Sequence, residues 1–280
     1  MHTQKRMQLG VGERGKTCEV DGVRLVYIDE GEGPILLCTH AVGHGASDFN
    51  ALRKRLSGYR VIALDWPGHG NSARDHKETS PWRYAELMEG FIEKLSLQQP
   101  FLLGNSIGGA ASIEYTAKHP DKVKGLILCD PGGIHKRGWF ERLGIAMMVK
   151  FFAWGARGGF GFKSMFSMYY RQVLQTKAAQ KQRELIVSTA LEQAPLLKEA
   201  WASFGQEKAD LRKVVQQITC PVWCAWSKRD LSIPLSKSLP AIKQFPNVEI
   251  STFRGGHSAF LEVPDAFAEK LQGFLDKCEL

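Results

Sequence analysis

Gly104-Asn105-Ser106-Ile107-Gly108, directly after the apolar run Phe101-Leu102-Leu103, is the stretch of this sequence that decides its fold. A strand that turns sharply into a helix holds its turning residue in a strained backbone conformation. The residues two positions to either side must then be small, so that strand and helix can approach each other. Gly104 and Gly108 meet that need. The pentapeptide therefore predicts a nucleophilic serine, Ser106, at a strand-to-helix turn.

A helical pattern follows this turn. Apolar and charged residues interleave from Ile107 to Lys118, and His119-Pro120 ends the pattern. The backbone N–H of Ile107 lies in the first helical turn, where no carbonyl of the helix accepts it. It is therefore expected to donate to the oxyanion that forms when Ser106 attacks a carbonyl. The helix also makes a chance Gly-x-Ser-x-Gly match in a loop the weaker interpretation.

A serine hydroxyl is a weak nucleophile, so Ser106 requires a histidine base and a carboxylate that orients it. His257 follows the strand-like run from Val248 to Phe253 and precedes a helix that begins at Pro264. Asp230 follows another strand-like run, from Val222 to Trp226. Both side chains are expected at the carboxyl ends of strands, where Ser106 also lies.

The chain order Ser106, Asp230, His257 resembles that of the α/β-hydrolase superfamily. Two further segments resemble that family: Thr39-His40-Ala41-Val42-Gly43, which is similar to its oxyanion loop, and Asp65-Trp66-Pro67-Gly68-His69-Gly70-Asn71-Ser72, which is similar to its Asp-x-Pro-Gly-x-Gly-x-Ser turn. The resemblance covers nearly the whole chain. It implies an α/β fold with a mostly parallel, eight-stranded sheet flanked by helices, and an inserted helical cap.

The resemblance also implies roles for the residues of the first loop. The backbone N–H of Val42 becomes the second oxyanion donor beside that of Ile107, and His40 becomes a residue that braces the loop. Many relatives have glycine where this chain has Ala41, which tolerates positive φ poorly, so the loop is expected to differ locally. The remaining histidines are expected to be ordinary loop or surface residues: His44, His69, His76, His119 and His135.

Asp130 competes with Asp230 for the position of the acid. It ends the strand-like run from Gly125 to Cys129, and some relatives carry the acid at the end of that earlier strand. Its neighbours Pro131-Gly132-Gly133 also suit a simple turn. Asp230 is the favoured candidate, and Asp130 is the alternative.

Strand and helix patterns alternate along most of the chain, which indicates a parallel sheet covered on both faces. Val20 to Asp29 predicts a hairpin with Asp21-Gly22 at its turn. Further strands are expected at 35–39, 59–64, 101–103, 125–129, 222–226 and 248–253, and helices at 48–56, 81–97, 107–118, 235–244 and 264–277. The alternation stops after Gly133 and resumes near Cys220. The predicted division is a core of residues 1–132 and 217–280 and a helical cap insertion of residues 133–216.

The predicted cap is rich in aromatic and methionine side chains. Most of them are expected to pack within the cap, and a subset is expected to face Ser106 and form an apolar pocket. The candidates for this subset are Trp139, Met147, Phe151 and Met165.

The composition and the apolar segments of the chain indicate where in the cell the protein is expected. The chain has 280 residues, 44% of them hydrophobic, enough for one such domain with an insertion. No apolar segment follows the basic residues near the N-terminus, which argues against a signal peptide. The longest nearly apolar stretch, Leu143 to Trp154, is interrupted by Lys150 and is shorter than the roughly 20 residues of a membrane-spanning helix. The sequence therefore predicts a cytoplasmic protein without an integral membrane segment.

Composition also bears on cofactors and partners. The formal net charge is +8, but Lys and Arg are dispersed and no nucleic-acid motif is present, so no nucleic-acid partner is expected. Cys38, Cys129, Cys220 and Cys224 are expected to be buried free thiols. No further Cys or His completes a metal set with them. The expected partner is a small-molecule ester, with no cofactor and no metal, and the oligomeric state stays open.

The leading interpretation is a carboxylesterase that acts on an ester with an apolar moiety through an acyl-enzyme. One alternative is carbon–carbon bond hydrolysis, because the residues from Gly104 to Gly109 and from Asp130 to Gly133 resemble hydrolases of aromatic ring-fission products. Those enzymes usually have a glycine-rich oxyanion loop and a tryptophan after the histidine, where this chain has Ala41-Val42 and Ser258. A second alternative is a ligand-binding protein that keeps the fold without turnover.

Overall fold

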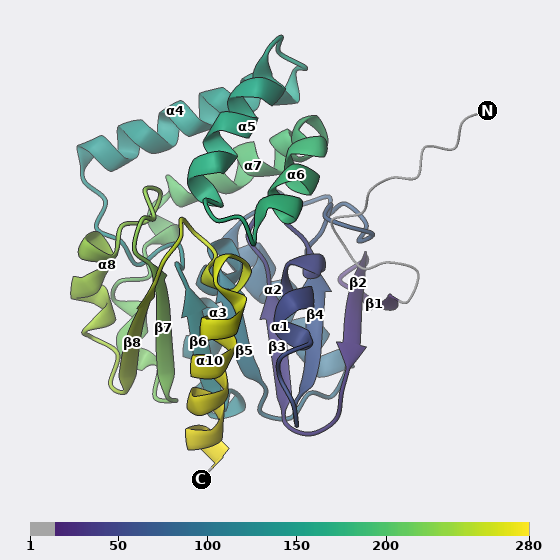
Figure 1. Cartoon of the computed structure of the whole chain (residues 1–280), viewed down its shortest axis with the longest axis vertical. Helices are drawn as coiled ribbons and strands as arrows, with labels where there is room; N and C mark the ends of the chain where they lie inside the picture. The colour runs from purple at the N-terminus through teal and green to yellow at the C-terminus, as the bar shows by residue number, and fades with distance from the viewer. Residues whose placement is uncertain (1–14, 280) are drawn as a thin grey trace.

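The computed structural model describes residues 15–279, which form one eight-stranded sheet with helices on both faces (Figure 1). The strands are β1 (Lys16–Val20), β2 (Val23–Glu30), β3 (Ile35–Thr39), β4 (Arg60–Asp65), β5 (Phe101–Asn105), β6 (Gly125–Cys129), β7 (Val222–Ser227) and β8 (Val248–Phe253). Their order in the sheet is β1-β2-β4-β3-β5-β6-β7-β8. The β1–β2 hairpin and the β2–β4 pair are antiparallel, and every other pair is parallel. The predicted mostly parallel, eight-stranded sheet is confirmed.

The central strands are buried on both faces because helices cover both. Every residue of β5 and β6 is buried. Successive side chains of a strand point to opposite faces, and the core divides accordingly. Leu36 and Leu103 belong to one apolar cluster, whereas Leu37 and Leu102 belong to the other. The near-continuous apolar runs of these strands follow from this double burial.

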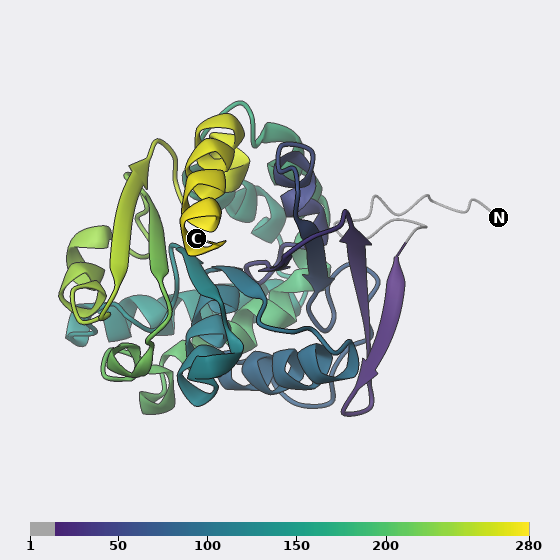
Figure 2. The same cartoon turned by 90° about the horizontal axis from the view of Figure 1, so that it is seen from below.

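Each face of the sheet has its own helices, and Figure 2 shows the sheet between the two layers. One face carries α1 (Asn50–Arg53), α9 (Ala259–Glu262) and α10 (Pro264–Glu279). The other face carries α2 (Pro81–Lys94), α3 (Ile107–Lys118) and α8 (Leu235–Ile242). Short 3-10 turns occupy Ala46–Phe49, Pro120–Lys122, Glu207–Ala209 and Val214–Gln217. The predicted helix over 48–56 is thus a 3-10 turn followed by the four residues of α1.

Four helices between β6 and β7 lie over the carboxyl ends of the parallel strands (Figure 1). They are α4 (Trp139–Ala156), α5 (Phe162–Val173), α6 (Gln180–Ser188) and α7 (Ala190–Phe204). Buried aromatic rings hold α4 and α5 together: Phe152 meets Phe162 and Phe166 edge to face, with ring centroids 6.5 and 6.3 Å apart. The division into a core and a cap of residues 133–216 stays our proposal for this arrangement.

Two expectations from composition concern buried thiols and membrane-spanning helices. Cys38, Cys129, Cys220 and Cys224 are buried free thiols, as predicted. Across residues 15–279, none of the helices combines the length and apolarity needed to cross a bilayer.

Candidate active site

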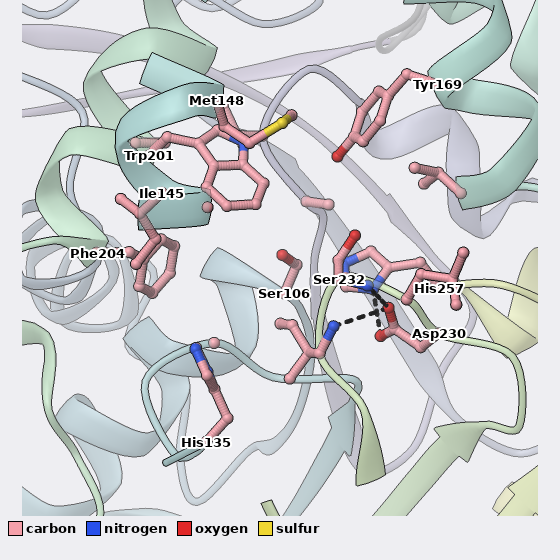
Figure 3. Close-up of a pocket in the computed structure, with 18 of the residues that line it drawn as sticks. Ser106, His135, Ile145, Met148, Tyr169, Trp201, Phe204, Asp230, Ser232 and His257 are labelled. Carbon is pink, nitrogen blue, oxygen red and sulfur yellow. Dashed lines mark hydrogen bonds and ion pairs between the residues drawn. The ribbon is translucent and has the colours of Figure 1, made fainter. Parts of the chain in front are cut away.

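Ser106 occupies a strained turn between β5 and α3. Its φ and ψ are 55° and −115°, a conformation that non-glycine residues rarely adopt. Two glycines permit the turn: a Cβ on Gly104 would lie 2.6 Å from backbone atoms of the following helix, and one on Gly108 would lie 2.6 Å from the Thr39 carbonyl oxygen. The strand-to-helix turn predicted from the sequence is therefore present, and the Ser106 hydroxyl points into a cavity (Figure 3).

His257 and Asp230 form a buried pair beside Ser106. The imidazole Nδ1 of His257 lies 2.7 Å from Oδ2 of Asp230. The other carboxylate oxygen, Oδ1, accepts the backbone N–H groups of Ser232 and Ile233 at 2.8 and 2.9 Å. With both oxygens bonded, the carboxylate is fixed in orientation, and Nδ1 donates to it. The other ring nitrogen, Nε2, is therefore the one available to a ligand in the cavity that His257 lines.

The charge of Asp230 alters the acidity of His257. Burial favours the neutral imidazole, but the charge and hydrogen bond of Asp230 oppose it, with smaller contributions from Asp130 and Glu262. Together they raise the pKa of His257 to about 9. The site thus stabilises an imidazolium, the species that a general base becomes after it accepts a proton.

Asp130 lies next to this pair but makes other contacts. Its two carboxylate oxygens accept the backbone N–H and the hydroxyl of Ser227 at 2.8 and 3.0 Å. Burial and the neighbouring Asp230 raise its pKa well above the ordinary value. A donor atom from each of Asp130, Asp230 and His257 lies within 4.8 Å of the others, close enough for a metal ion. Yet all four carboxylate oxygens already accept hydrogen bonds from N–H or O–H groups, so the geometry suits a hydrogen-bonded cluster better than a metal centre.

Asn105 connects the serine turn to the histidine loop. Its amide group donates to the carbonyl oxygens of Cys129 and His257 at 2.9 and 3.0 Å, and its amide oxygen accepts the hydroxyl of Ser258 at 2.9 Å. No role was predicted for this side chain from the sequence. Its one signal was a polar residue at the end of an otherwise apolar strand. The structure shows that Asn105 fixes the spacing of the two loops.

Two neutral histidines brace the loop that contains Val42. The Nδ1 atom of His40 donates to the Ala41 carbonyl at 2.7 Å, and its Nε2 accepts the Trp66 N–H at 3.0 Å. The Nε2 atom of His69 accepts the Gly43 N–H at 2.8 Å. Burial lowers the pKa of both rings, that of His69 to about 4, so both can accept hydrogen bonds at neutral pH. The bracing role expected for His40 matches these contacts, and His69, expected to be ordinary, shares it.

The substitution of alanine for glycine in this loop causes no backbone strain. Ala41 does not adopt positive φ, whereas Gly43 does, at 80°. Ala41 and Val42 line the same cavity as Ser106. Ile107 begins α3, where its N–H has no carbonyl acceptor in the helix. Val42 thus lines the same cavity as Ser106, and Ile107 follows Ser106 directly, so the assignment of their N–H groups as oxyanion donors stays a prediction.

A cavity of about 550 Å³ lies between the strand ends and three of the helices above them, α4, α5 and α7. Its apolar wall is formed mainly by Ala41, Val42, Ile145, Met147, Met148, Leu197, Ala200, Trp201, Phe204 and Ile233. Figure 3 shows Ser106 at one side of this space, with His257 and Asp230 beside it and Met148, Trp201 and Phe204 across from it. The cavity suits a ligand with a substantial apolar part.

Of the four predicted pocket residues, Met147 lies on the cavity wall. The other three lie elsewhere. Trp139 is 65% exposed and Met165 is 52% exposed, whereas Phe151 packs against Phe162 with ring centroids 4.9 Å apart. The composition of these segments predicted apolar side chains in the cap but not which side of each helix faces the strands, so three of the four placements differ from the prediction.

Two histidines expected to be ordinary also line the cavity. His44 is buried, and its Nδ1 lies 2.6 Å from a carboxylate oxygen of Asp48. Burial lowers the pKa of His135 to about 4, so its ring is neutral, and its Nδ1 has no hydrogen-bond partner in the described part of the chain. Neither position had a signal in the sequence, because each depends on the packing of helices above the sheet.

Residues 35–270 match the model of the alpha/beta hydrolase family. The chain belongs to this family. The prediction of a hydrolase with this fold is therefore confirmed.

Two relatives are similar over nearly their whole length. One is a 2-hydroxy-6-oxononadienedioate/2-hydroxy-6-oxononatrienedioate hydrolase of Comamonas testosteroni, and the other is a 2-hydroxy-6-oxo-6-phenylhexa-2,4-dienoate hydrolase of Burkholderia cepacia. Each is 25% identical, and each alignment covers 95% of this chain and 94% of the relative. The predicted resemblance to hydrolases of ring-fission products is thus borne out in sequence.

Solved structures show the same fold. A putative lipase from Acinetobacter baumannii superposes with a TM-score of 0.82 at 20% identity, covering 95% of this chain and 92% of the lipase. An esterase from Thermogutta terrifontis superposes with a TM-score of 0.80 at 21% identity, covering 94% and 97%. At this level of identity the likeness concerns the fold alone.

Proposed function

We propose that this protein is a cofactor-independent serine hydrolase that acts on a carboxylic ester with an apolar moiety. One observation carries the proposal: Ser106, on its strained turn, faces the same largely apolar cavity as the hydrogen-bonded pair of His257 and Asp230. A nucleophile, a base and an orienting carboxylate are the parts that acyl transfer requires. We further propose that the enzyme works in the cytoplasm.

The first half of the reaction forms an acyl-enzyme. The Ser106 hydroxyl oxygen attacks the ester carbonyl carbon while Nε2 of His257 takes its proton. The backbone N–H groups of Val42 and Ile107 donate to the resulting oxyanion, and such donors typically stabilise the transition state by about 3 to 4 kcal/mol each. The C–O bond to the alcohol then breaks, and the imidazolium gives its proton to the departing oxygen.

The second half releases the acid. Water loses a proton to His257 as it attacks the acyl carbon, and the bond to Ser106 breaks as the serine oxygen regains a proton. Asp230 keeps the proton on Nδ1 throughout, so that Nε2 is always the nitrogen that exchanges protons with the reactants. In the free enzyme no hydrogen bond within the described residues joins Ser106 to His257. Contacts of this kind often form only once substrate is bound.

The charges around the cavity favour an ester over a ring-fission dienoate. A dienoate carries a carboxylate, which needs an unpaired cation when it enters an apolar site. Lys237, the lysine on the cavity wall, forms an ion pair with Glu141, which lies on the same wall. A neutral ester requires no such partner. The similarity to two ring-fission hydrolases supports carbon–carbon bond hydrolysis as the second candidate.

A panel of chromogenic esters of increasing acyl length tests the proposal. Wild-type protein is expected to hydrolyse several of them, and Ser106→Ala is expected to lose this activity while keeping its fold by circular dichroism. A kcat/KM for a ring-fission dienoate well above that for every ester would establish the second candidate instead. Ester binding without hydrolysis, with equal affinity in wild type and Ser106→Ala, would indicate a ligand-binding protein.

A further inference from the structure

Large apolar side chains gather on the outer face of the helices above the cavity. Within residues 15–279, ten large apolar side chains are exposed, and seven of these lie between residues 139 and 168. They are Trp139, Phe140, Leu143, Met147, Phe160, Met165 and Met168. Exposed apolar residues on a soluble protein are normally scattered, whereas a gathered set marks a binding surface. We call these seven side chains the apolar face.

The helical period of α4 places three of these residues in one stripe. Trp139, Leu143 and Met147 are spaced four residues apart, so they form one stripe along α4, while Phe152 is buried against α5. Met165 and Met168 lie on the exposed side of α5. Figure 1 shows both helices at the end of the molecule opposite to the C-terminus, beyond the sheet.

The turn between α4 and α5 extends the apolar face. Phe160 is fully exposed, and it stands between two glycines with left-handed backbone, Gly158 at φ 72° and Gly161 at φ 80°. These conformations hold the turn away from the body of the protein. The ring of Phe160 buries no surface within the fold, so all of it is available to a partner.

The charged side chains of residues 139–173 indicate what kind of partner binds the apolar face. From residue 139 to residue 173 there are five basic side chains and one acidic side chain, and the acidic one, Glu141, pairs with Lys237. None of the five basic side chains forms an ion pair within the described chain, and all are exposed: Arg142, Lys150, Arg157, Lys163 and Arg171. A second copy of the protein bound through the same face would bring these unpaired cations against their own copies. A surface with anionic lipid headgroups would instead neutralise them while its acyl region accepts the apolar side chains.

We propose that the apolar face docks this protein on an anionic lipid bilayer. The cavity gives the docking a consequence, because Phe140 and Met147 belong both to the apolar face and to the cavity wall. The mouth of the cavity therefore lies beside the lipid. An apolar ester can pass from the bilayer to Ser106 without entering bulk water. This second part rests on the proposed function, whereas the docking itself does not.

Vesicle flotation tests the docking. Full-length Ser106→Ala protein is mixed with vesicles of phosphatidylcholine and phosphatidylglycerol, or with vesicles of phosphatidylcholine alone. It is expected to float with the anionic vesicles and to be released as salt is added. The quadruple variant Leu143→Gln, Phe160→Ser, Met165→Gln, Met168→Gln is expected to bind at least roughly tenfold more weakly, because it loses most of the apolar area without touching the cavity.

A matched control removes exposed apolar side chains from elsewhere on the surface. The double variant Leu191→Gln, Ile250→Gln changes residues that are 48% and 41% exposed, and it is expected to float like the parent protein. Equal loss in the control and the quadruple variant, or no flotation of the parent protein, would overturn the proposal. A parent dimer that the quadruple variant converts to monomer, without vesicle binding, would overturn it in favour of a second copy.

Hydrolysis of a soluble short-chain ester separates this proposal from the proposed function. The quadruple variant in an otherwise wild-type chain is expected to keep that activity, while its hydrolysis of an ester dissolved in anionic vesicles falls. Flotation without any ester hydrolysis would leave the docking established and refute the esterase.

Discussion

Replacing Asp230 with asparagine is expected to separate the charge of this residue from its shape. The Oδ1 atom of Asp230 accepts two backbone N–H groups, so the side chain of asparagine should place its oxygen there and its amide nitrogen toward His257. An amide N–H cannot accept a proton from Nδ1. It would therefore favour the tautomer with the proton on Nε2, which cannot act as a base toward Ser106. The fold of the loop is expected to be retained.

The size of the effect follows from the acidity of His257. Its pKa is raised from the ordinary 6.5 to about 9, chiefly by Asp230 acting against burial. This difference corresponds to roughly 3 kcal/mol of preference for the imidazolium. Loss of that preference together with the wrong tautomer is expected to lower kcat by roughly a thousandfold or more, as in other serine hydrolases with the same change.

The pH profile gives a second readout with a definite sign. The neutral imidazole is the base, so kcat/KM of the wild type is expected to rise with pH through about 9, the pKa of His257 in the free enzyme. Removal of the Asp230 charge lowers that pKa, so the rise in any residual activity of Asp230→Asn should move to lower pH. Initial rates on a chromogenic ester between neutral and alkaline pH measure both quantities.

Asp130→Asn is the matched control for this variant. Asp130 bonds to Ser227 and not to His257, and an asparagine can still accept the Ser227 N–H and donate to the Ser227 hydroxyl. Its kcat is expected to fall less than roughly tenfold, because the substitution keeps the hydrogen bonds to Ser227 and leaves the bond between Asp230 and His257 in place. A greater loss in Asp130→Asn than in Asp230→Asn, or an unchanged pH profile in Asp230→Asn, would refute the assignment of Asp230.

Three further predictions concern the surroundings of the site. Gly108→Ala is expected to lower the free energy of unfolding in a denaturant titration, because its Cβ would clash with backbone atoms. Gly273→Ala in α10 should raise the free energy of unfolding by about 0.5 to 1 kcal/mol, because no atom lies within 4 Å of its added Cβ. Glu262→Gln is expected to cost about 1 to 3 kcal/mol in the same titration, because each carboxylate oxygen accepts two backbone N–H groups and one oxygen becomes a donor. Asn105→Ala should lower kcat more than it raises KM in ester hydrolysis, since it removes the link between the Ser106 turn and the loop of His257.

Each of these predictions has a contrary outcome. Equal stability of the two glycine variants would show that the turn is not tightly packed. An unchanged midpoint and slope for Glu262→Gln would show that its four contacts contribute nothing net. A KM effect alone for Asn105→Ala would place that residue in substrate binding instead.

The sheet was predictable because its signals are local. The strands at 35–39, 125–129 and 248–253 and the helix at 107–118 have the bounds that their apolar runs and the His119-Pro120 stop indicate. The strained turn at Ser106 was predictable for the same reason, since the two glycines that permit it stand beside it in the sequence. The helix at 48–56 was predicted too long, because the chain there first makes a 3-10 turn in which the Ala46 N–H bonds to the Asp65 side chain.

The contacts between distant segments were not predictable. The sequence left Asp130 as a rival of Asp230, because both end strands, and only the placement of His257 shows which carboxylate reaches it. The same limit applies to the helices above the cavity. The sequence shows which of their residues are apolar, but the exposure of Trp139 and the place of Met147 on the cavity wall depend on how α4 packs against α5 and α7.

Labelling with a fluorophosphonate probe shows whether Ser106 is an activated nucleophile. The probe forms a covalent bond only with a serine that is activated by a base and placed beside oxyanion donors. Mass spectrometry of the digested wild-type protein is expected to find one adduct, on the peptide that contains Ser106, and none in Ser106→Ala or in heat-denatured protein. Folded wild-type protein without an adduct on Ser106, or with its adduct on another serine, would contradict the account.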